Sequence, residues 1–154
     1  MTTVSGYLSL LQESDPVLLE YALTSLDAAC PQAWAEMAGW VPTIGRFAKD
    51  AGFPHQKLAA LVCSKVHYFL DEMEESLEFA LSAGDLFDVT QNSEYISTLV
   101  AKAIDTFVTI RIKRSELSAS ANAAQEVCCF FLVLFKKRKE EFFSNPFFNF
   151  FFKF

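Results

Sequence analysis

Apolar residues recur at helical spacing between Leu58 and Asp105, and this pattern predicts three consecutive helices. The first helix starts near Leu58, the second near Met73 and the third near Ser93. The third has the most regular apolar stripe, typical of a helix that packs one face against a core. The residues predicted to face inward are Leu58, Leu61, Val62, Val66, Phe69 and Leu70, then Leu77, Ala80 and Leu81, then Ile96, Leu99, Val100, Ala103, Phe107 and Ile110.

Residues that favour helix ends flank these three segments. Pro54 precedes the first helix, where a missing N–H costs little, and Gly84 can take a left-handed conformation at the end of the second. Asn92 and Ser93 are suitable N-caps for the third. Only residues 71–73 join the first two helices, and so short a connection predicts an antiparallel helical hairpin.

Small residues in this predicted hairpin partly match the spacing of a tetratricopeptide-type helix pair; they are Ser64, Ser76, Ala80 and Ala83. A hairpin of this kind cannot bury its apolar face alone and must stack on neighbouring hairpins. The sequence therefore predicts an all-α fold of antiparallel helical hairpins stacked as an α-solenoid fragment.

The first 55 residues fit the same helical interpretation. A short helix begins at Ser5, and Asp15 caps a second helix that has Pro16 in its first turn. We expect Leu19, Ala22, Leu23 and Leu26 to face inward. Pro31, Pro42 and Gly52 are expected to delimit two further short helices, the second of which carries Ile44, Phe47 and Ala48.

Charge divides the chain into two parts. Residues 1–110 contain 15 acidic and 5 basic residues, a net charge of −10, whereas residues 111–154 contain 4 acidic and 8 basic residues, a net charge of +4. An acidic body argues against nucleic-acid binding, because phosphates are neutralised by lysine and arginine. We predict an N-terminal helical rod segment over residues 1–110 and a divergent tail over 111–154, first basic and then rich in phenylalanine.

The end of the tail has an unusual composition, because 8 of its last 13 residues are phenylalanine. Its longest nearby apolar stretch, from Val127 to Phe135, has 9 residues, whereas a membrane-spanning helix needs about 20. The N-terminus lacks the pattern of a signal peptide. Our hypothesis is that the tail, from somewhere after Phe107, is translated intron or otherwise non-homologous sequence; the alternative is a genuine interaction tail.

No group of residues assembles a catalytic, cofactor or metal site in the sequence. Cys30, Cys63 and the adjacent pair at 128 and 129 form no C-x-x-C motif and lack zinc-site spacing. Cys63 and His67 lie four apart on one helix, but two ligands do not make a closed metal site. We expect His55 to be exposed and His67 to be at the surface or partly buried. The five glycines form no phosphate-binding loop.

An acidic cluster surrounds the predicted hairpin turn; its members are Asp71, Glu72, Glu74, Glu75 and Glu78. Such carboxylates can serve acid–base chemistry or bind a cation, but the residues lack the EF-hand pattern. The favoured interpretation is structural, because negative charge in the first turn of a helix complements the helix dipole. A contact patch for a basic partner surface is a third interpretation.

The order and spacing of several short segments resemble one protein family. These segments are Trp34-Ala35-Glu36, Ala59-Ala60-Leu61-Val62, Ser64-Lys65-Val66, Glu74-Glu75-Ser76-Leu77, Ala80-Leu81, Ala83-Gly84-Asp85-Leu86-Phe87, Asn92-Ser93-Glu94-Tyr95, Ala101-Lys102 and Ile104-Asp105. Together, over about residues 4–107, they resemble the N-terminal region of the largest non-ATPase scaffold subunit, with proteasome/cyclosome repeats, of the 26S proteasome regulatory particle base. The family usually has glycine in the hairpin turn, where this chain has Asp71.

The resemblance implies a non-catalytic scaffold segment that acts in ubiquitin-dependent protein catabolism through contacts with other regulatory-particle subunits of lid and base. It implies a cytoplasmic and nuclear protein without cofactor, small-molecule substrate, nucleic acid or membrane. The alternatives are a free-standing helical-repeat adaptor for a peptide or protein, or a truncated product without assembly function. Because a solenoid without a capping repeat exposes an apolar end, we predict that Trp34, Trp40 and the apolar stripe of the helix from Ser93 are partly exposed. We also predict weak solubility or self-association of the isolated chain.

Overall fold

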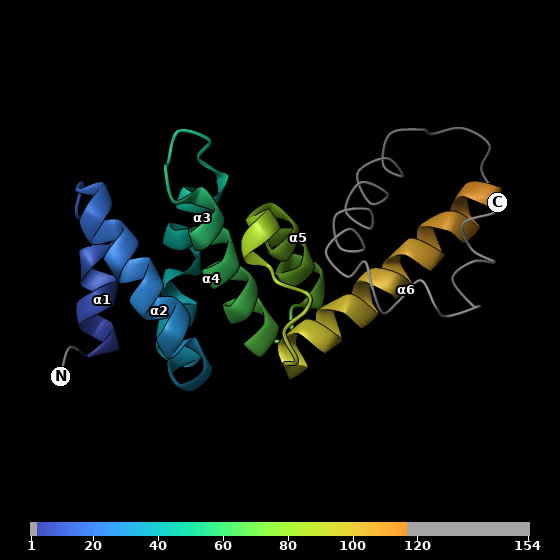
Figure 1. The fold of residues 1–154 in the computed structure, drawn as a ribbon, viewed down its shortest axis with the longest axis horizontal. Helices are drawn as coiled ribbons and strands as arrows, with labels where there is room; N and C mark the ends of the chain where they lie inside the picture. The colour runs from blue at the N-terminus through green and yellow to red at the C-terminus, as the bar shows by residue number, and fades with distance from the viewer. Residues whose placement is uncertain (1–2, 117–154) are drawn as a thin grey trace. The chain divides into compact units, whose positions relative to one another are not determined.

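The computed structural model describes residues 3–116, with side chains described up to Arg111. All regular structure in this part of the chain is helical, so the all-α prediction is confirmed. The chain divides into two compact units, Met1–Phe87 and Asp88–Phe154. In the first unit, α1 and α2 lie side by side and are followed by α3, α4 and α5 (Figure 1).

The first helical pair consists of α1 (Val4–Leu10) and α2 (Pro16–Met37). Asp15 caps α2 as predicted, because its Oδ1 accepts a hydrogen bond from the Val17 backbone N–H at 2.9 Å and Pro16 follows at the first helical position. The inward residues of α2 were predicted correctly, and they are Leu19, Ala22, Leu23 and Leu26.

The expectation that Pro31 delimits a helix is wrong. Pro31 lies inside the 22-residue helix α2, which continues to Met37. A proline in a helix interior removes one backbone hydrogen bond but does not end the helix when packing holds both flanking turns. Cys30, Ala33 and Met37 are buried around this position, and their packing outweighs the local preference of proline.

A 3₁₀ turn, η1 (Ala38–Trp40), leads from α2 into α3 (Val41–Lys49). Helix α3 carries Ile44, Phe47 and Ala48, as predicted; Ile44 and Ala48 are buried and Phe47 is half-buried. The predicted helix after Pro54 is α4 (Gln56–Phe69), and it contacts α2, α3 and α5. Helix α4 is therefore the central helix of the first unit.

The predicted apolar face of α4 is only partly correct. Val62 and Val66 are buried, but Leu58 and Leu61 are half-buried, and the fully buried positions include Ala59, Ala60, Cys63 and Ser64. Because three helices surround α4, small side chains occupy the closest approaches and the larger leucines lie at the margins.

Helix α5 (Met73–Ala83) forms the predicted antiparallel hairpin with α4. It ends at Gly84, which has a φ of 57° as expected for a glycine C-cap, and a 3₁₀ turn, η2 (Gly84–Leu86), follows. In the hairpin turn, Asp71 has a φ of 63° and is the only non-glycine residue with positive φ among the described residues. This conformation explains why glycine suits the position.

The second unit contains α6 (Glu94–Glu116), which begins as predicted after Ser93. The Ser93 hydroxyl accepts a hydrogen bond from the Ile96 backbone N–H at 3.2 Å and so caps the helix. Of the predicted stripe, Ile96, Leu99 and Ala103 are buried, whereas Val100, Phe107 and Ile110 are half-buried, so the stripe is partly exposed. Because α6 continues to Glu116, the predicted boundary at residue 110 falls inside a helix; the division into rod and tail stays a prediction.

Candidate functional site

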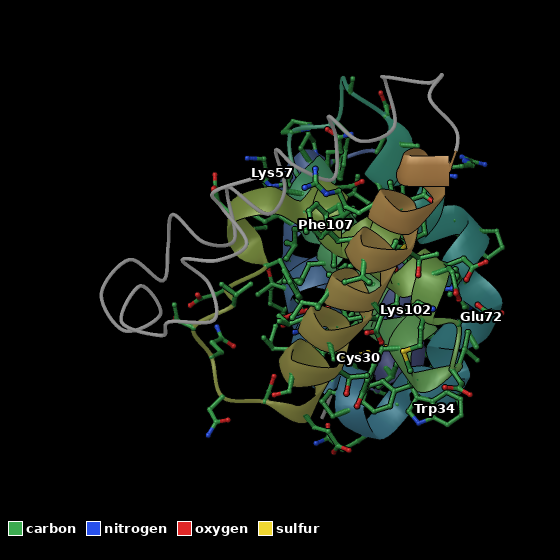
Figure 2. The ribbon with its side chains drawn as sticks, turned by 90° about the vertical axis from the view of Figure 1, so that its right-hand side faces the viewer. Cys30, Trp34, Lys57, Glu72, Lys102 and Phe107 are labelled. Atoms are coloured by element: carbon green, nitrogen blue, oxygen red, sulfur yellow. The ribbon has the colours of Figure 1, made fainter. Side chains whose placement is uncertain are left out.

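The two described cysteines have properties opposite to those of a nucleophile or metal ligand. Cys30 and Cys63 are both free thiols with no exposed surface. Burial raises the pKa of each thiol from 9.0 to about 12, and the charge of Lys65 near Cys30 or of Lys49 near Cys63 lowers it only in part. Both thiols therefore remain protonated near neutral pH, whereas a reactive cysteine is a thiolate at that pH. Figure 2 shows Cys30 further inside the molecule than Trp34 of the same helix.

His67 is buried and takes part in the packing of the α4–α5 hairpin. Its Nδ1 lies 2.6 Å from Oε2 of Glu72, and its ring stacks on Phe79 of α5 with centroids 5.3 Å apart. The residue is more buried than we expected because the hairpin turn folds back over it. His55, which was expected to be exposed, is half-buried, and its Nε2 lies 3.7 Å from Oε2 of Glu20 in α2. Both imidazoles thus link structural elements.

The acidic cluster at residues 71–78 does not converge on one point. Glu72 pairs with His67, whereas Glu74 and Glu75 lie in the first turn of α5, where the helix dipole favours negative charge. Within residues 3–116, no three His, Cys, Asp or Glu side chains are grouped so that they can hold a metal ion. The geometry therefore agrees with the structural interpretation of these carboxylates.

Two polar contacts of the first unit, one buried and one half-buried, were not predicted. The Ser64 hydroxyl donates to the Ser76 carbonyl oxygen at 2.7 Å, and the Ser76 hydroxyl donates to the Ser64 carbonyl oxygen, also at 2.7 Å. We call this reciprocal pair the serine clasp. In addition, Lys65 Nζ of α4 lies 2.7 Å from Asp27 Oδ1 of α2, an oxygen atom that is itself buried. The small size of the two serines was noted from the sequence, but nothing there indicated that they pair.

A groove of about 550 Å³ lies between α3 and α5 in the first unit. One side carries the cations of Arg46 and Lys49, and the other carries the carboxylates of Glu75 and Glu78. Phe79 forms an apolar wall, with Lys49 Nζ 5.7 Å from the centroid of its ring. Asp50 and His67 also line the groove, and the described residues of its lining include no serine, threonine or cysteine.

Several large apolar side chains of the described residues are exposed instead of buried. In the first unit they are Val17, Leu18, Tyr21 and Leu86, and in the second they are Ile104 and Val108. Trp34 and Trp40 are half-buried, as predicted. Within residues 3–116, no helix is both long enough and apolar enough to cross a membrane. Single exposed apolar side chains are normal on protein surfaces, whereas a contiguous group of them marks a candidate contact surface.

The chain matches the family model of the N-terminal domain of the 26S proteasome subunit RPN2 over residues 2–135. It is 44% identical over 118 residues to 26S proteasome non-ATPase regulatory subunit 1 homolog A of Arabidopsis thaliana, and that alignment covers 75% of this chain and 12% of the relative. Identity to the Drosophila melanogaster non-ATPase regulatory subunit 1 is 39% over 126 residues, covering 82% of this chain and 12% of that protein. Identity to Saccharomyces cerevisiae RPN2 is 36% over 108 residues, covering 70% of this chain and 11% of the relative.

These matches define how far the resemblance extends. The chain spans about 12% of the length of the curated relatives that it matches first. The family match continues beyond Phe107, where the quoted segments end, to residue 135. Our hypothesis about the tail concerns residues that are mostly outside the described part of the chain, as are Cys128 and Cys129, and it stays a prediction.

Proposed function

Because the chain belongs to the family of the N-terminal domain of 26S proteasome subunit RPN2, we propose that it acts as a non-catalytic scaffold segment of the proteasome regulatory particle. The observation that carries this proposal is the family match over residues 2–135. The relatives are named non-ATPase regulatory subunits of the 26S proteasome. In this proposal the chain serves ubiquitin-dependent protein catabolism by holding other subunits in place.

The packing of the first unit supports a scaffold role. Its buried polar side chains, Ser64, His67 and Ser76, are all engaged in contacts within the α4–α5 hairpin. Because these groups are used for packing, the hairpin is suited to act as a rigid element that presents its outer faces to partners. We propose that these partners are regulatory-particle subunits of lid and base, and that the protein acts in the cytoplasm and nucleus.

Affinity purification from the source cell tests this proposal. The full chain carries a C-terminal tag, and quantitative mass spectrometry measures regulatory-particle subunits against a tag-only control. The expected result is enrichment of several such subunits. A matched variant, Leu23→Pro, places proline in the buried interior of α2 and should abolish the enrichment. Equal recovery of these subunits with the tag alone would reject the scaffold role.

The groove between α3 and α5 supports a second candidate, a helical-repeat adaptor that binds a peptide. Its opposite charges, at Lys49 and Glu78, would select a peptide with both acidic and basic side chains. This candidate is favoured if the purification recovers no regulatory-particle subunit but recovers one other protein whose binding Lys49→Glu abolishes. The scaffold role is favoured if Lys49→Glu leaves recovery of the regulatory-particle subunits unchanged.

A further inference from the structure

The N-terminal part of α2 exposes three large apolar side chains next to one another. The exposed fractions are 70% for Val17, 39% for Leu18 and 54% for Tyr21. Tyr21 lies four positions after Val17 and three after Leu18, the two spacings that make residues neighbours on a helix surface. The Tyr21 ring also packs edge-to-face against Tyr7 of α1, with centroids 5.9 Å apart, which extends the apolar surface onto the neighbouring helix.

The exposed side of α2 also lacks charge beyond these residues. Helical periodicity places Thr24, Ala28 and Ala35 on the same side as Val17 and Tyr21, and all of them are exposed. Asp27 is the only charged residue between Tyr21 and Ala35, and it pairs with Lys65 of α4. A helix face that meets only water normally carries charged or polar residues, and of Thr24, Ala28 and Ala35 only Thr24 is polar. We call this exposed, uncharged side, from Val17 to Ala35, the outer face of α2.

The charged residues that α1, α2 and their connecting segment place around the outer face of α2 are all acidic, although Lys65 of α4 and His55 in the turn before it approach α2. Glu13, Asp15, Glu20 and Glu36 are all exposed, and the sequence contains no lysine, arginine or histidine before Arg46. The Glu20 carboxylate lies near the imidazole of His55, but its side chain remains more than half exposed. A border of one sign attracts partners of opposite charge and repels acidic ones.

From this combination we propose that the outer face of α2 is a docking surface for an amphipathic helix of another protein subunit, with an apolar stripe flanked by lysine or arginine. The apolar stripe packs on Val17, Leu18 and Tyr21, where tyrosine and exposed aliphatic groups supply contact area. Small residues further along α2 allow two helices to approach closely, and the flanking cations face the acidic border. The assignment of the partner to the regulatory particle rests on the proposed function. The existence of the docking surface and the chemistry of its partner are argued independently of that function.

The test uses three fluorescent helical peptides of about 18 residues, long enough to cover most of α2. The first has leucines at i, i+3, i+4 and i+7 with flanking lysines, the second has the same stripe with flanking glutamates, and the third scrambles the first. Fluorescence anisotropy measures their binding to the purified full chain. We expect the first to bind at least about tenfold more tightly than the other two, because only it satisfies both the apolar and the acidic features.

Matched variants locate the binding. Val17→Ser with Leu18→Ser should weaken binding of the first peptide about tenfold, whereas Leu86→Ser, which removes a leucine that is 45% exposed in η2, should leave it unchanged. Glu13→Gln with Glu20→Gln should weaken binding severalfold and reduce its salt dependence. Circular dichroism melting curves that match those of the unsubstituted chain show that each variant is folded.

Several results would overturn the proposal. These are equal binding of all three peptides, no binding of the first peptide, or equal loss with Leu86→Ser. If sedimentation velocity shows a dimer of the unsubstituted chain and a monomer of the Val17→Ser, Leu18→Ser variant, the surface binds a second copy of the chain instead. If the peptides discriminate as expected but purification recovers no regulatory-particle subunit, the proposed function fails and the docking surface stands. If the subunits are recovered but the peptides bind equally, the docking surface fails and the proposed function stands.

Discussion

The two helical hairpins of the first unit, α1–α2 and α4–α5, differ in which side chains they bury and which they expose. In α4–α5 the polar groups Ser64, Ser76 and His67 are buried and paired within the hairpin. In α1–α2 the apolar groups Val17, Leu18 and Tyr21 are exposed to solvent. The first arrangement pairs its polar groups internally, and the second leaves apolar surface in water that the proposed partner helix would cover. Burial therefore distinguishes a hairpin that maintains the fold from one that is suited to recognition.

Thiol reactivity gives the largest expected contrast between the two hairpins. Burial raises the pKa of Cys63 in α4 from 9.0 to about 12, so at pH 8 its thiolate fraction should be about a thousandfold below that of an ordinary thiol. A cysteine introduced by Val17→Cys, at a site that is 70% exposed, should react as an ordinary thiol. Alkylation by iodoacetamide, followed by peptide mass spectrometry, measures both rates in one sample.

The same pKa predicts how stability depends on pH. Because the folded state holds the Cys63 proton more tightly than the unfolded state, its contribution is constant below pH 9 and falls as pH rises from 9 toward 12. Cys63→Ala should reduce this alkaline loss in denaturation curves. Rapid alkylation of Cys63 in the folded chain at pH 8 would contradict the burial on which the comparison depends.

Equal leucine truncations in the two hairpins should differ in their effect on stability. Leu77→Ala in α5 removes a side chain that is 8% exposed and should lower the free energy of unfolding by about 2–4 kcal/mol. Leu18→Ala in α2, at 39% exposure, should change it by less than about 0.5 kcal/mol. Urea denaturation followed by circular dichroism measures both. Similar losses for the two variants would show that the α1–α2 surface is part of the core.

The serine clasp should contribute a smaller, coupled amount. Ser64→Ala and Ser76→Ala each remove one hydroxyl that donates to the other residue's carbonyl oxygen at 2.7 Å. Each should cost about 1 kcal/mol, partly offset by the higher helix propensity of alanine. The double variant should lose less than the sum, because the two hydroxyl groups also lie 3.3 Å apart. Strictly additive losses in this double-mutant cycle would mean that the two bonds act independently. Ser82→Ala, at an exposed site in the same helix, is the control.

The smallest effect is expected at the hairpin turn. Asp71 has a φ of 63°, a backbone conformation that costs free energy for any residue with a Cβ atom. Asp71→Gly should therefore stabilise the chain by about 0.5 kcal/mol. Asp71→Ala should destabilise it by a similar amount, since alanine lacks the polar side chain that helps aspartate to tolerate this conformation. Thermal denaturation compares the three. A lower melting temperature for the glycine variant would contradict a strained turn.

Sequence reasoning was most successful where one local signal determined the structure. The Asp15 cap, the Ser93 cap, the Gly84 helix end and the short turn at Asp71 each depend on nearby residues, and the structure confirms all four. It was wrong at Pro31, because the packing of Cys30 and Ala33 holds α2 together across a residue that usually interrupts helices. Here a tertiary contact outweighed a local preference.

The candidate surfaces were harder to predict for a related reason. Helical periodicity assigns the largest apolar residues to the core. It therefore predicted that Leu58 and Leu61 lie on the buried face of α4, although Ala59 and Ala60 are more buried there. It contains no information about a second apolar side on α2, since Val17 and Tyr21 differ from core residues only in what covers them. The Asp27–Lys65 pair joins residues 38 positions apart, and no local pattern indicates such a contact.

The absence of basic residues before Arg46 has a practical consequence for mapping neighbours of this chain. Helices α1 and α2 contain no side-chain amine, because the first lysine is Lys49. Cross-linkers that join two lysines will therefore report no contact of the α1–α2 hairpin through a side chain, however firmly it is bound. A carbodiimide, which condenses a carboxylate with an amine at zero length, can use Glu13, Glu20 or Glu36 instead. An empty lysine cross-link map at this end of the protein would thus reflect its composition and carry no information about its partners.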